Sequence, residues 1–192
     1  MKNHCLLAPF ALAIAAVVAA PAGAQEVLTG DTRLACEATL CLATGTRPGE
    51  CAPSLSRYFS IHKRKWSDTV RARASFLSLC PVSDQTPEMR ALVGAMANGA
   101  GRCDAASLNV TLRVWNHADG GRVFINNQMP GYCAAYTGHQ YTNPGDLAPG
   151  YVGTPERGGY WVDARDQDAA LARYNDRIAA EDSRRRNDEW YR

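Results

Sequence analysis

Between residues 30 and 103 the apolar positions recur with the spacing of helices that bury one face. Start signals, which are small polar caps or a proline in the first turn, precede four such stretches. The predicted helices begin at Asp31 or Thr32, at Pro53, at Lys65 or Ser67, and at Pro87. In the third of these helices, which should run to Leu79, Arg71 and Arg73 lie off the apolar stripe and are expected on the outer face.

The pattern changes after Cys103. Val110, Leu112 and Val114 alternate with polar or larger residues, a turn sequence occupies 117–121, and a second apolar stretch covers 122–125. This combination predicts a β-hairpin. From Gly120 to Gly159 the chain contains nine of its 16 glycines and four of its ten prolines. We expect this part, and the tyrosine-rich stretch 129–160 in particular, to form a long loop that is ordered by docking on the helices or on a partner.

Residues 163–192 differ from both earlier parts, because they contain eight acidic residues and seven arginines but few apolar residues. Leu171, Tyr174 and Ile178 form a sparse stripe, so a solvated helix or a frayed tail is expected. The predicted fold is mainly α with a small β-hairpin and a long Gly/Pro/Tyr-rich loop. Its organisation is one domain over 25–162 followed by a charged C-terminal segment over 163–192.

The first 24 residues have the composition of a secretory signal peptide. Lys2 supplies a positive charge, an apolar run extends from Cys5 to Ala20, and small residues precede a cleavage point after Ala24. The apolar run is too short and too rich in alanine to favour a membrane span. This pattern therefore predicts that the protein is exported and that its mature chain begins at Gln25 and has no membrane span.

If the chain is exported, the number of cysteines that remain after cleavage becomes informative. Six are left, an even number, which in an oxidising compartment predicts a disulfide framework. These are Cys36, Cys41, Cys51, Cys80, Cys103 and Cys133. A zinc site would need closely spaced cysteine pairs with histidines at ligand spacing. The closest cysteines are five apart and the histidines do not cluster, so no metal site is expected.

Helix geometry limits the pairing of these cysteines. If Cys36 and Cys41 share a helix, their Cα atoms lie about 8–9 Å apart and their side chains point about 140° apart. That distance is too long for a disulfide, so each should bond to a different neighbour. Cys51 precedes the second helix and Cys80 ends the third, and these ends meet if the two helices are antiparallel. A Cys51–Cys80 bond is therefore one pairing to expect, while the other connectivities stay open.

Charge argues against nucleic acid or an anionic membrane as a general partner. The chain has 21 basic and 19 acidic residues, and losing Lys2 with the signal peptide leaves a net charge of +1. The 168 residues that remain of 192 after cleavage fit one domain with a core of its own.

The case for an enzyme is weak. Glu37 could act as a general acid, but a glycosidase needs a second carboxylate close by, and an exposed helical acid is the simpler interpretation. The chain contains no nucleophile-elbow, phosphate-loop, dinucleotide or metalloprotease motif. No catalytic residue and no cofactor is therefore assigned.

Two segments are candidates for binding. The basic cluster His62–Lys65 next to Trp66 could bind an anion, although a basic turn between helices is commoner. The stretch from Met129 to Trp161 is the stronger candidate, because aromatic side chains on a loop suit protein interfaces. Its possible partner-binding residues are Tyr132, Tyr136, Tyr141, Tyr160 and Trp161. The alternative is that these rings cover the apolar core.

Several runs of residues resemble one family. Leu28–Ala38, Cys41–Leu42 and Arg47–Leu55 are similar to the TrbM family of conjugal transfer proteins in both cysteine spacing and flanking residues. The similarity continues through Leu79–Pro81 and returns at Met129–Cys133, whereas the charged C-terminal segment lies outside it.

The resemblance implies an exported accessory or assembly protein of a conjugative type IV secretion system in the periplasm of a Gram-negative bacterium. Its partners would be other components of that apparatus, and the resemblance assigns no catalytic residues. Two alternatives remain. One is a periplasmic enzyme acting on peptidoglycan through Glu37 and a second carboxylate. The other is a purely structural disulfide module of the pilus or channel.

Overall fold

The computed structural model describes residues 28–116 and 120–190; the predicted signal peptide and part of the predicted hairpin turn lie outside this range. Helices and two small antiparallel sheets make up the described chain. The helices are α1 (Gly30–Ala43), α2 (Ala52–Ser60), α3 (Trp66–Leu77), α4 (Pro87–Gly99), α5 (Ala105–Thr111), α6 (Gly131–Thr137) and α7 (Gln167–Trp190), with short 3-10 turns η1 (Gly49–Cys51), η3 (Gly145–Leu147), η4 (Pro155–Arg157) and η5 (Ala164–Asp166). The strands are β1 (Arg113–Asn116), β2 (Arg122–Ile125), β3 (Pro149–Val152) and β4 (Tyr160–Asp163).

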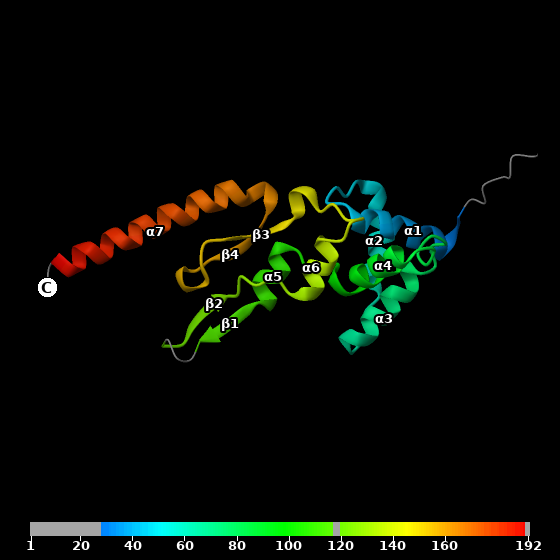
Figure 1. Cartoon of the computed structure of the whole chain (residues 1–192), viewed down its shortest axis with the longest axis horizontal. Coiled ribbons are helices and arrows are strands. Elements are labelled where there is room, and N and C mark those ends of the chain that lie inside the picture. Colours follow the sequence, from blue (N-terminus) through cyan, green and yellow to red (C-terminus); the bar gives the residue numbers. More distant parts are fainter. Residues whose placement is uncertain (1–27, 117–119, 191–192) are drawn as a thin grey trace, which may run out of the picture.

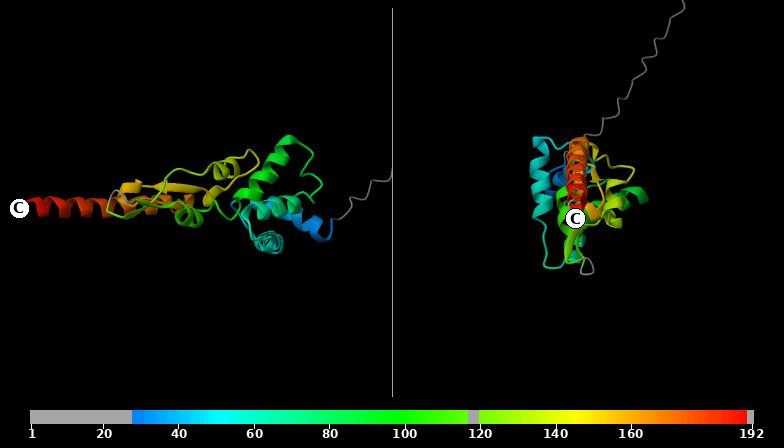
Figure 2. Two further views of the ribbon diagram at one scale, coloured as in Figure 1. Left: turned by 90° about the horizontal axis from the view of Figure 1, so that it is seen from below. Right: turned by 90° about the vertical axis from the view of Figure 1, so that its left-hand side faces the viewer.

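The molecule is elongated. Helices α1 to α4 and α6 form a body at one end, the two hairpins β1–β2 and β3–β4 lie in the middle, and α7 projects away at the other end (Figure 1). The left view of Figure 2, turned by 90° about the horizontal axis, shows the same order along the long axis. In the described part of the chain no helix combines the length and the apolar character needed to cross a bilayer.

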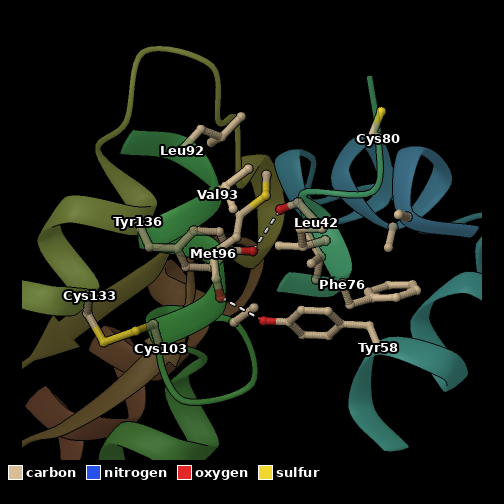
Figure 3. Packing of buried hydrophobic residues seen from close by; sticks show 14 of the residues in the cluster. Leu42, Tyr58, Phe76, Cys80, Leu92, Val93, Met96, Cys103, Cys133 and Tyr136 are labelled. Carbon is tan, nitrogen blue, oxygen red and sulfur yellow. Dashed lines mark hydrogen bonds between the residues drawn. A yellow bond between two sulfur atoms is a disulfide. The ribbon is translucent and has the colours of Figure 1, made fainter. Parts of the chain in front are cut away.

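The core lies where α1, α2, α3, α4 and α6 converge (Figure 3). Leu77 and Met96 are fully buried there. Two tyrosines bring hydroxyl groups into this apolar region, and each donates a hydrogen bond to a main-chain carbonyl. Tyr58 bonds the Met96 oxygen at 2.8 Å, and Tyr136 bonds the Leu42 oxygen at 2.7 Å. These bonds offset the desolvation of the hydroxyls and join α2 to α4 and α6 to α1.

The four predicted helices are present, and the sequence signals explain their starts. α4 begins after Thr86, whose side chain accepts a hydrogen bond from the Met89 amide, and Pro87 occupies the first turn. The third helix ends at Leu77, two residues earlier than expected. The expected outer position of Arg73 was wrong, because its side chain is buried against aromatic rings.

The hairpin is present but starts later than its alternation suggested. Val110 belongs to α5 and is 70% exposed, so it is not a strand residue. Asp104 caps this helix by accepting a hydrogen bond from the Ser107 amide, and this local cap holds the segment in a helix despite its β-like alternation. β1 therefore begins at Arg113 and pairs antiparallel with β2, with Trp115 opposite Val123.

The expected long loop was wrong, since 129–160 contains α6 and most of a second hairpin. β3 pairs with β4 so that Tyr151 lies opposite Trp161. Their rings meet edge to face with centroids 5.3 Å apart. The Asn109 side chain, on α5, bonds both the amide and the carbonyl of Trp161 at 2.8 and 2.7 Å. Contacts between residues that are far apart in the sequence therefore hold this sheet in place.

The charged C-terminal segment forms one 24-residue helix, α7. Ala170 and Tyr174 are buried with Val152 in a small second core, and Ile178 packs against it. Leu171, expected on the apolar stripe, is 44% exposed. The first turns of α7 are therefore held by β3, while the rest of the helix extends away from the molecule (Figure 1).

All six cysteines in the described part of the chain form disulfides. The bonds are Cys36–Cys80, Cys41–Cys51 and Cys103–Cys133. The expectation that Cys36 and Cys41 bond to different neighbours is confirmed, with Cα separations of 4.9 and 5.8 Å in their bonds. The suggested Cys51–Cys80 bond was wrong. η1 places Cys51 beside the last turns of α1, where Cys41 lies, and the end of α3 reaches Cys36 instead.

Removal of one disulfide at a time should destabilise the protein in the order of the chain length that each bond encloses. The bonds enclose separations of 44, 30 and 10 residues. The loop-entropy relation gives losses of about 4 kcal/mol for Cys36–Cys80, about 3.6 for Cys103–Cys133 and about 2.7 for Cys41–Cys51. Denaturant unfolding of the three Cys→Ala pair variants measures this order. A larger loss for Cys41–Cys51 than for Cys36–Cys80 would contradict it.

Candidate protein-binding surface

The five aromatic residues expected to bind a partner do not share one surface. Tyr136 and Trp161 are 9% and 5% exposed and pack in the main core. Tyr160 lies partly buried against the second core, and Tyr132 packs against the main one. Tyr141 is 47% exposed. Most of these rings therefore cover apolar surface of the protein itself, as the alternative interpretation stated.

Tyr132 has a defined structural contact. The Arg102 guanidinium lies between two rings, 4.1 Å from the Tyr132 centroid and 4.5 Å from the Trp66 centroid. Cys103 and Cys133, the next residues along the chain, form a disulfide that holds Arg102 and Tyr132 together. A guanidinium stacked between ring faces stabilises the junction of α3, α6 and the end of α4.

The basic cluster His62–Lys65 lies in the connection between α2 and α3. The main-chain amide of Lys63 donates to the Thr69 hydroxyl at 2.9 Å, which fixes the start of α3. Trp66 turns away from this cluster, since its indole nitrogen donates to Asn98 at 3.2 Å. The cluster thus lies in a turn between two helices, the arrangement that the sequence analysis gave as the commoner one.

Glu37 forms an ion pair of the kind that is common on the surface of a helix. Its carboxylate accepts a hydrogen bond at 2.8 Å from Arg33, one turn earlier on α1. Over residues 28–116 and 120–190, no group of three or more histidine, cysteine, aspartate or glutamate side chains is arranged to hold a metal ion.

A different site lies where the first hairpin faces α7. The groove between β2, η4 and α7 has a volume of about 440 Å³. Arg122, Val123 and Phe124 line one side, and Pro155 to Gly158 line another. α7 contributes Arg177, Glu181 and Arg185. We call this hollow the arginine groove, because four arginines and two glutamates line it.

Ion pairs hold the η4 side of the arginine groove to α7. Arg157 donates to Glu181 at 3.3 Å and to Asp182 at 2.7 Å, and Arg177 donates to Glu181 at 2.7 Å. Arg177 also donates to the main-chain oxygens of Arg157 and Gly158. Hydrogen bonds from Arg177 and Arg157 lower the pKa of Glu181, and one from Arg157 lowers the pKa of Asp182.

Charged side chains of both signs line this site. Its arginines are Arg122, Arg157, Arg177 and Arg185, and its acidic residues are Glu156 and Glu181. Arg157 and Arg177 pair with acidic side chains of α7, and Arg122 also has an interaction partner.

An exposed apolar pair lies beside the arginine groove. Trp115 and Val123 face each other across the hairpin and are 56% and 47% exposed. The hairpin is held at its base by the second one. Tyr151 donates its hydroxyl to the Ile125 oxygen at 2.7 Å, and the Trp161 indole donates to the Asn126 oxygen at 3.0 Å. The exposed pair is therefore presented on an anchored ribbon.

Sequence reasoning predicted the hairpin but missed this site. The alternating stretch around Val114 and the charged C-terminal segment were both recognised, yet their proximity depends on β3–β4 and on Tyr174 docking α7. Nothing in the spacing of Arg122 and Arg185 signals that they line one hollow. The exposure of Trp115 is likewise seen only in the structure.

Comparison with known proteins gives one family. A sequence profile of the TrbM family matches residues 27–175, which include both hairpins and the first turns of α7. No curated protein and no solved structure is similar enough to the chain to count as a match.

Replacing Arg157 should loosen the contact between η4 and α7. Arg157→Ala removes the donor to Glu181 and Asp182, so amides of α7 from Tyr174 to Asp182 should exchange hydrogen a few times faster. Arg165→Ala is the control, since Arg165 pairs with Asp163 and Asp166 at the other end of the helix. Equal exchange in the two variants would show that Arg157 does not hold the helix.

Acid should weaken the same contact. The lowered pKa values mean that Glu181 and Asp182 stabilise the docked helix fully above the ordinary carboxyl pKa of about 4. This contribution is lost as the pH falls through their depressed values. Carboxyl-carbon NMR titration should give midpoints below those of free Glu and Asp, and Arg157→Ala should raise both. Unshifted midpoints would contradict the ion-pair geometry.

Proposed function

The chain belongs to the TrbM family, and on this basis we propose that it is an exported accessory protein of a conjugative type IV secretion system that acts by binding another protein. Membership over 149 of 192 residues, 27–175, identifies a conjugal transfer protein. The finer role, assistance in assembling the mating apparatus, is our proposal.

The cysteines support the proposed compartment. Three disulfides tie the described chain, and such bonds persist in oxidising compartments outside the cytoplasm. Together with the predicted signal peptide over 1–24, they support a periplasmic location. The proposed partners are therefore the periplasmic parts of secretion components, reached without crossing a membrane.

The observation that carries a binding role is the exposed Trp115–Val123 pair next to the arginine groove. Tryptophan and arginine are the residues most enriched at the energetic centres of protein interfaces. Trp115 is 56% exposed beside Val123, and an exposed apolar patch rimmed by polar residues is typical of protein interaction sites. The hairpin β1–β2, which contains the pair and part of the groove lining, lies away from helices α1 to α4 (Figure 1).

Of the residues first proposed to bind a partner, Tyr141 keeps an exposed ring and Tyr132 and Tyr160 remain partly accessible. They are proposed as secondary contacts only. Trp161 supports the binding face indirectly by anchoring the end of β2 through Asn126. Tyr136 is buried in the main core.

Truncating the exposed tryptophan should reduce partner recovery. We expect Trp115→Ala to lower at least about tenfold the amount of pilus or channel subunit crosslinked to the mature protein in the periplasm of conjugating cells, a typical loss for an interface anchor. Leu40→Ala on α1 is the matched control, because Leu40 is 70% exposed but lies on the helical body. Mass spectrometry after pull-down identifies the partners. Equal loss in both variants, or recovery of cell-wall fragments alone, would contradict the proposal.

A further inference from the structure

One disulfide of the described chain is more accessible than the other two, and it is the bond that joins α1 to the end of α3. Cys36 is partly exposed, whereas Cys80, to which it is bonded, is 3% exposed. The other bonded cysteines are at most 9% exposed, and they are Cys41, Cys51, Cys103 and Cys133. Thiol–disulfide exchange requires direct attack of a thiolate on a sulfur atom, so access decides which bond reacts first. In the folded protein an external thiolate therefore reaches Cys36 most readily.

Exposed apolar side chains surround this bond. Leu40 lies one turn after Cys36 on α1, so it shares a side of that helix, and it is 70% exposed. Leu79 and Val82 lie close to Cys80 in the sequence and are 45% and 46% exposed. The Cα atoms of the two bonded cysteines are 4.9 Å apart, so the bond brings these apolar residues to one region of the helical body. An exposed apolar region of this kind is typical of an interaction site.

The cysteine pairing gives the chain a need for disulfide exchange. The Cys41–Cys51 bond is nested inside the Cys36–Cys80 bond, so the first four cysteines are not paired in chain order. Cys36 is 15 residues from Cys51 but 44 residues from Cys80. Loop-closure entropy favours the shorter, non-native loop about fivefold in the unfolded chain. A chain that is oxidised before it folds therefore closes Cys36–Cys51 in competition with both native bonds, and this wrong bond must be reopened.

We propose that a thiol–disulfide exchange protein acts on this chain at Cys36 and rearranges its bonds until Cys36–Cys80 is formed. The inference goes beyond the proposed function and uses only its compartment, an oxidising space outside the cytoplasm. We call Cys36 and its rim, Leu40, Leu79 and Val82, the exchange patch. The partner must bring a reactive sulfur within bonding distance of Cys36, so the surface around that sulfur meets the exchange patch. The partner's thiol should therefore lie in an apolar cleft.

The rearrangement is an isomerisation that consumes no oxidant. It starts from the wrong pairs Cys36–Cys51 and Cys41–Cys80. The partner's thiolate attacks the Cys36 sulfur, forms a mixed disulfide and releases the Cys51 thiolate. Cys51 then attacks Cys41, which forms Cys41–Cys51 and releases the Cys80 thiolate. Cys80 attacks the Cys36 sulfur of the mixed disulfide, which forms Cys36–Cys80 and regenerates the partner's thiolate. Each step breaks one S–S bond and forms one, so the electrons balance.

A thiol-bearing protein fits the exchange patch better than a second copy of this chain. A second copy could cover Leu40 and Leu79, but all six cysteines of the described chain are already bonded, so it supplies no thiolate. The exchange protein leaves when Cys80 bonds to Cys36. The exchange patch therefore holds no lasting partner in the folded protein, and the hairpin face is free to bind independently of it.

The rate at which each bond opens tests the accessibility of Cys36. The native mature protein is treated with dithiothreitol, samples are quenched with an alkylating reagent at early times, and mass spectrometry identifies the released cysteines. We expect Cys36–Cys80 to open at least about tenfold faster than Cys103–Cys133 and Cys41–Cys51, because their sulfurs are buried. Opening of either other bond at the same rate or faster would overturn the inference.

A trapping experiment tests the attacked sulfur and the role of the apolar rim. The probe is an exchange protein with a Cys-x-x-Cys active site whose second cysteine is changed to alanine, so that the mixed disulfide persists. With the released Cys80 blocked by alkylation, the probe should be found on Cys36.

Two substitutions separate recognition from access. Leu79→Ser should slow trapping at least about threefold, because it removes apolar contact area, but it should leave the dithiothreitol rate unchanged. Val110→Ser is the matched control, since Val110 is 70% exposed but lies on α5. A probe bound to Cys80, or equal effects of the two substitutions on trapping, would contradict the proposal.

Refolding tests the need for exchange. The reduced, unfolded protein is refolded in a glutathione redox buffer with and without the intact exchange protein. Cys36–Cys51 should appear early, and the exchange protein should speed its conversion to Cys36–Cys80. The pair variant Cys41→Ala with Cys51→Ala lacks the competing cysteine, so it should form Cys36–Cys80 equally fast with and without the exchange protein.

Native pairing of the unsubstituted chain at the same rate without the exchange protein would overturn the inference. If the pair variant does not fold, the opening rates and the trapping still decide. All three measurements use purified protein, so their failure is distinguishable from failure to recover a secretion component in conjugating cells.

Discussion

The Cys36–Cys80 disulfide is the constraint on which the rest of the structure depends. It joins α1 to the end of α3 across 44 residues, and the two helices between these points are nine and 12 residues long. Helices of this length are marginal in water without tertiary packing. Closing this loop reduces the freedom of the unfolded chain and brings α1, α2 and α3 together, so that Leu42, Tyr58 and Leu77 form one core.

From this body the structure extends by contacts of decreasing burial. The Cys103–Cys133 bond adds α6, and Arg102 stacked between Trp66 and Tyr132 fixes its position. The Asn109 side chain then holds β4, and Tyr174 docks the first turns of α7 on β3. Beyond Tyr174, ion pairs with Arg157 do most of the holding. The arginine groove is therefore built at the less buried end of the molecule, where a partner can adjust it at low cost.

Much of the fold could be predicted from local signals. Capping residues such as Thr86 and the proline at position 87 set the start of α4, and helix geometry alone excluded a Cys36–Cys41 bond. The second hairpin could not be predicted, because Trp161 is held by Asn109, 52 residues earlier. The outer position predicted for Arg73 was wrong for a related reason. A charged residue is expected to be exposed, and the rings of Tyr58 and Trp66 that bury it come from other parts of the sequence or from packing that the sequence pattern does not show. The candidate site was not predicted, because its lining comes from β2, η4 and α7, which are brought together only by the folded structure.

The central claim is that the protein meets its partner through the hairpin face and not through the helical body. Site-specific photo-crosslinking in the periplasm of conjugating cells tests this most directly, with the photoreactive residue placed at Val123 in one strain and at Leu40 in another. We predict crosslinks from position 123 to a component of the secretion apparatus and none from position 40. Crosslinks from position 40 alone would place the partner on the helical body and contradict the account.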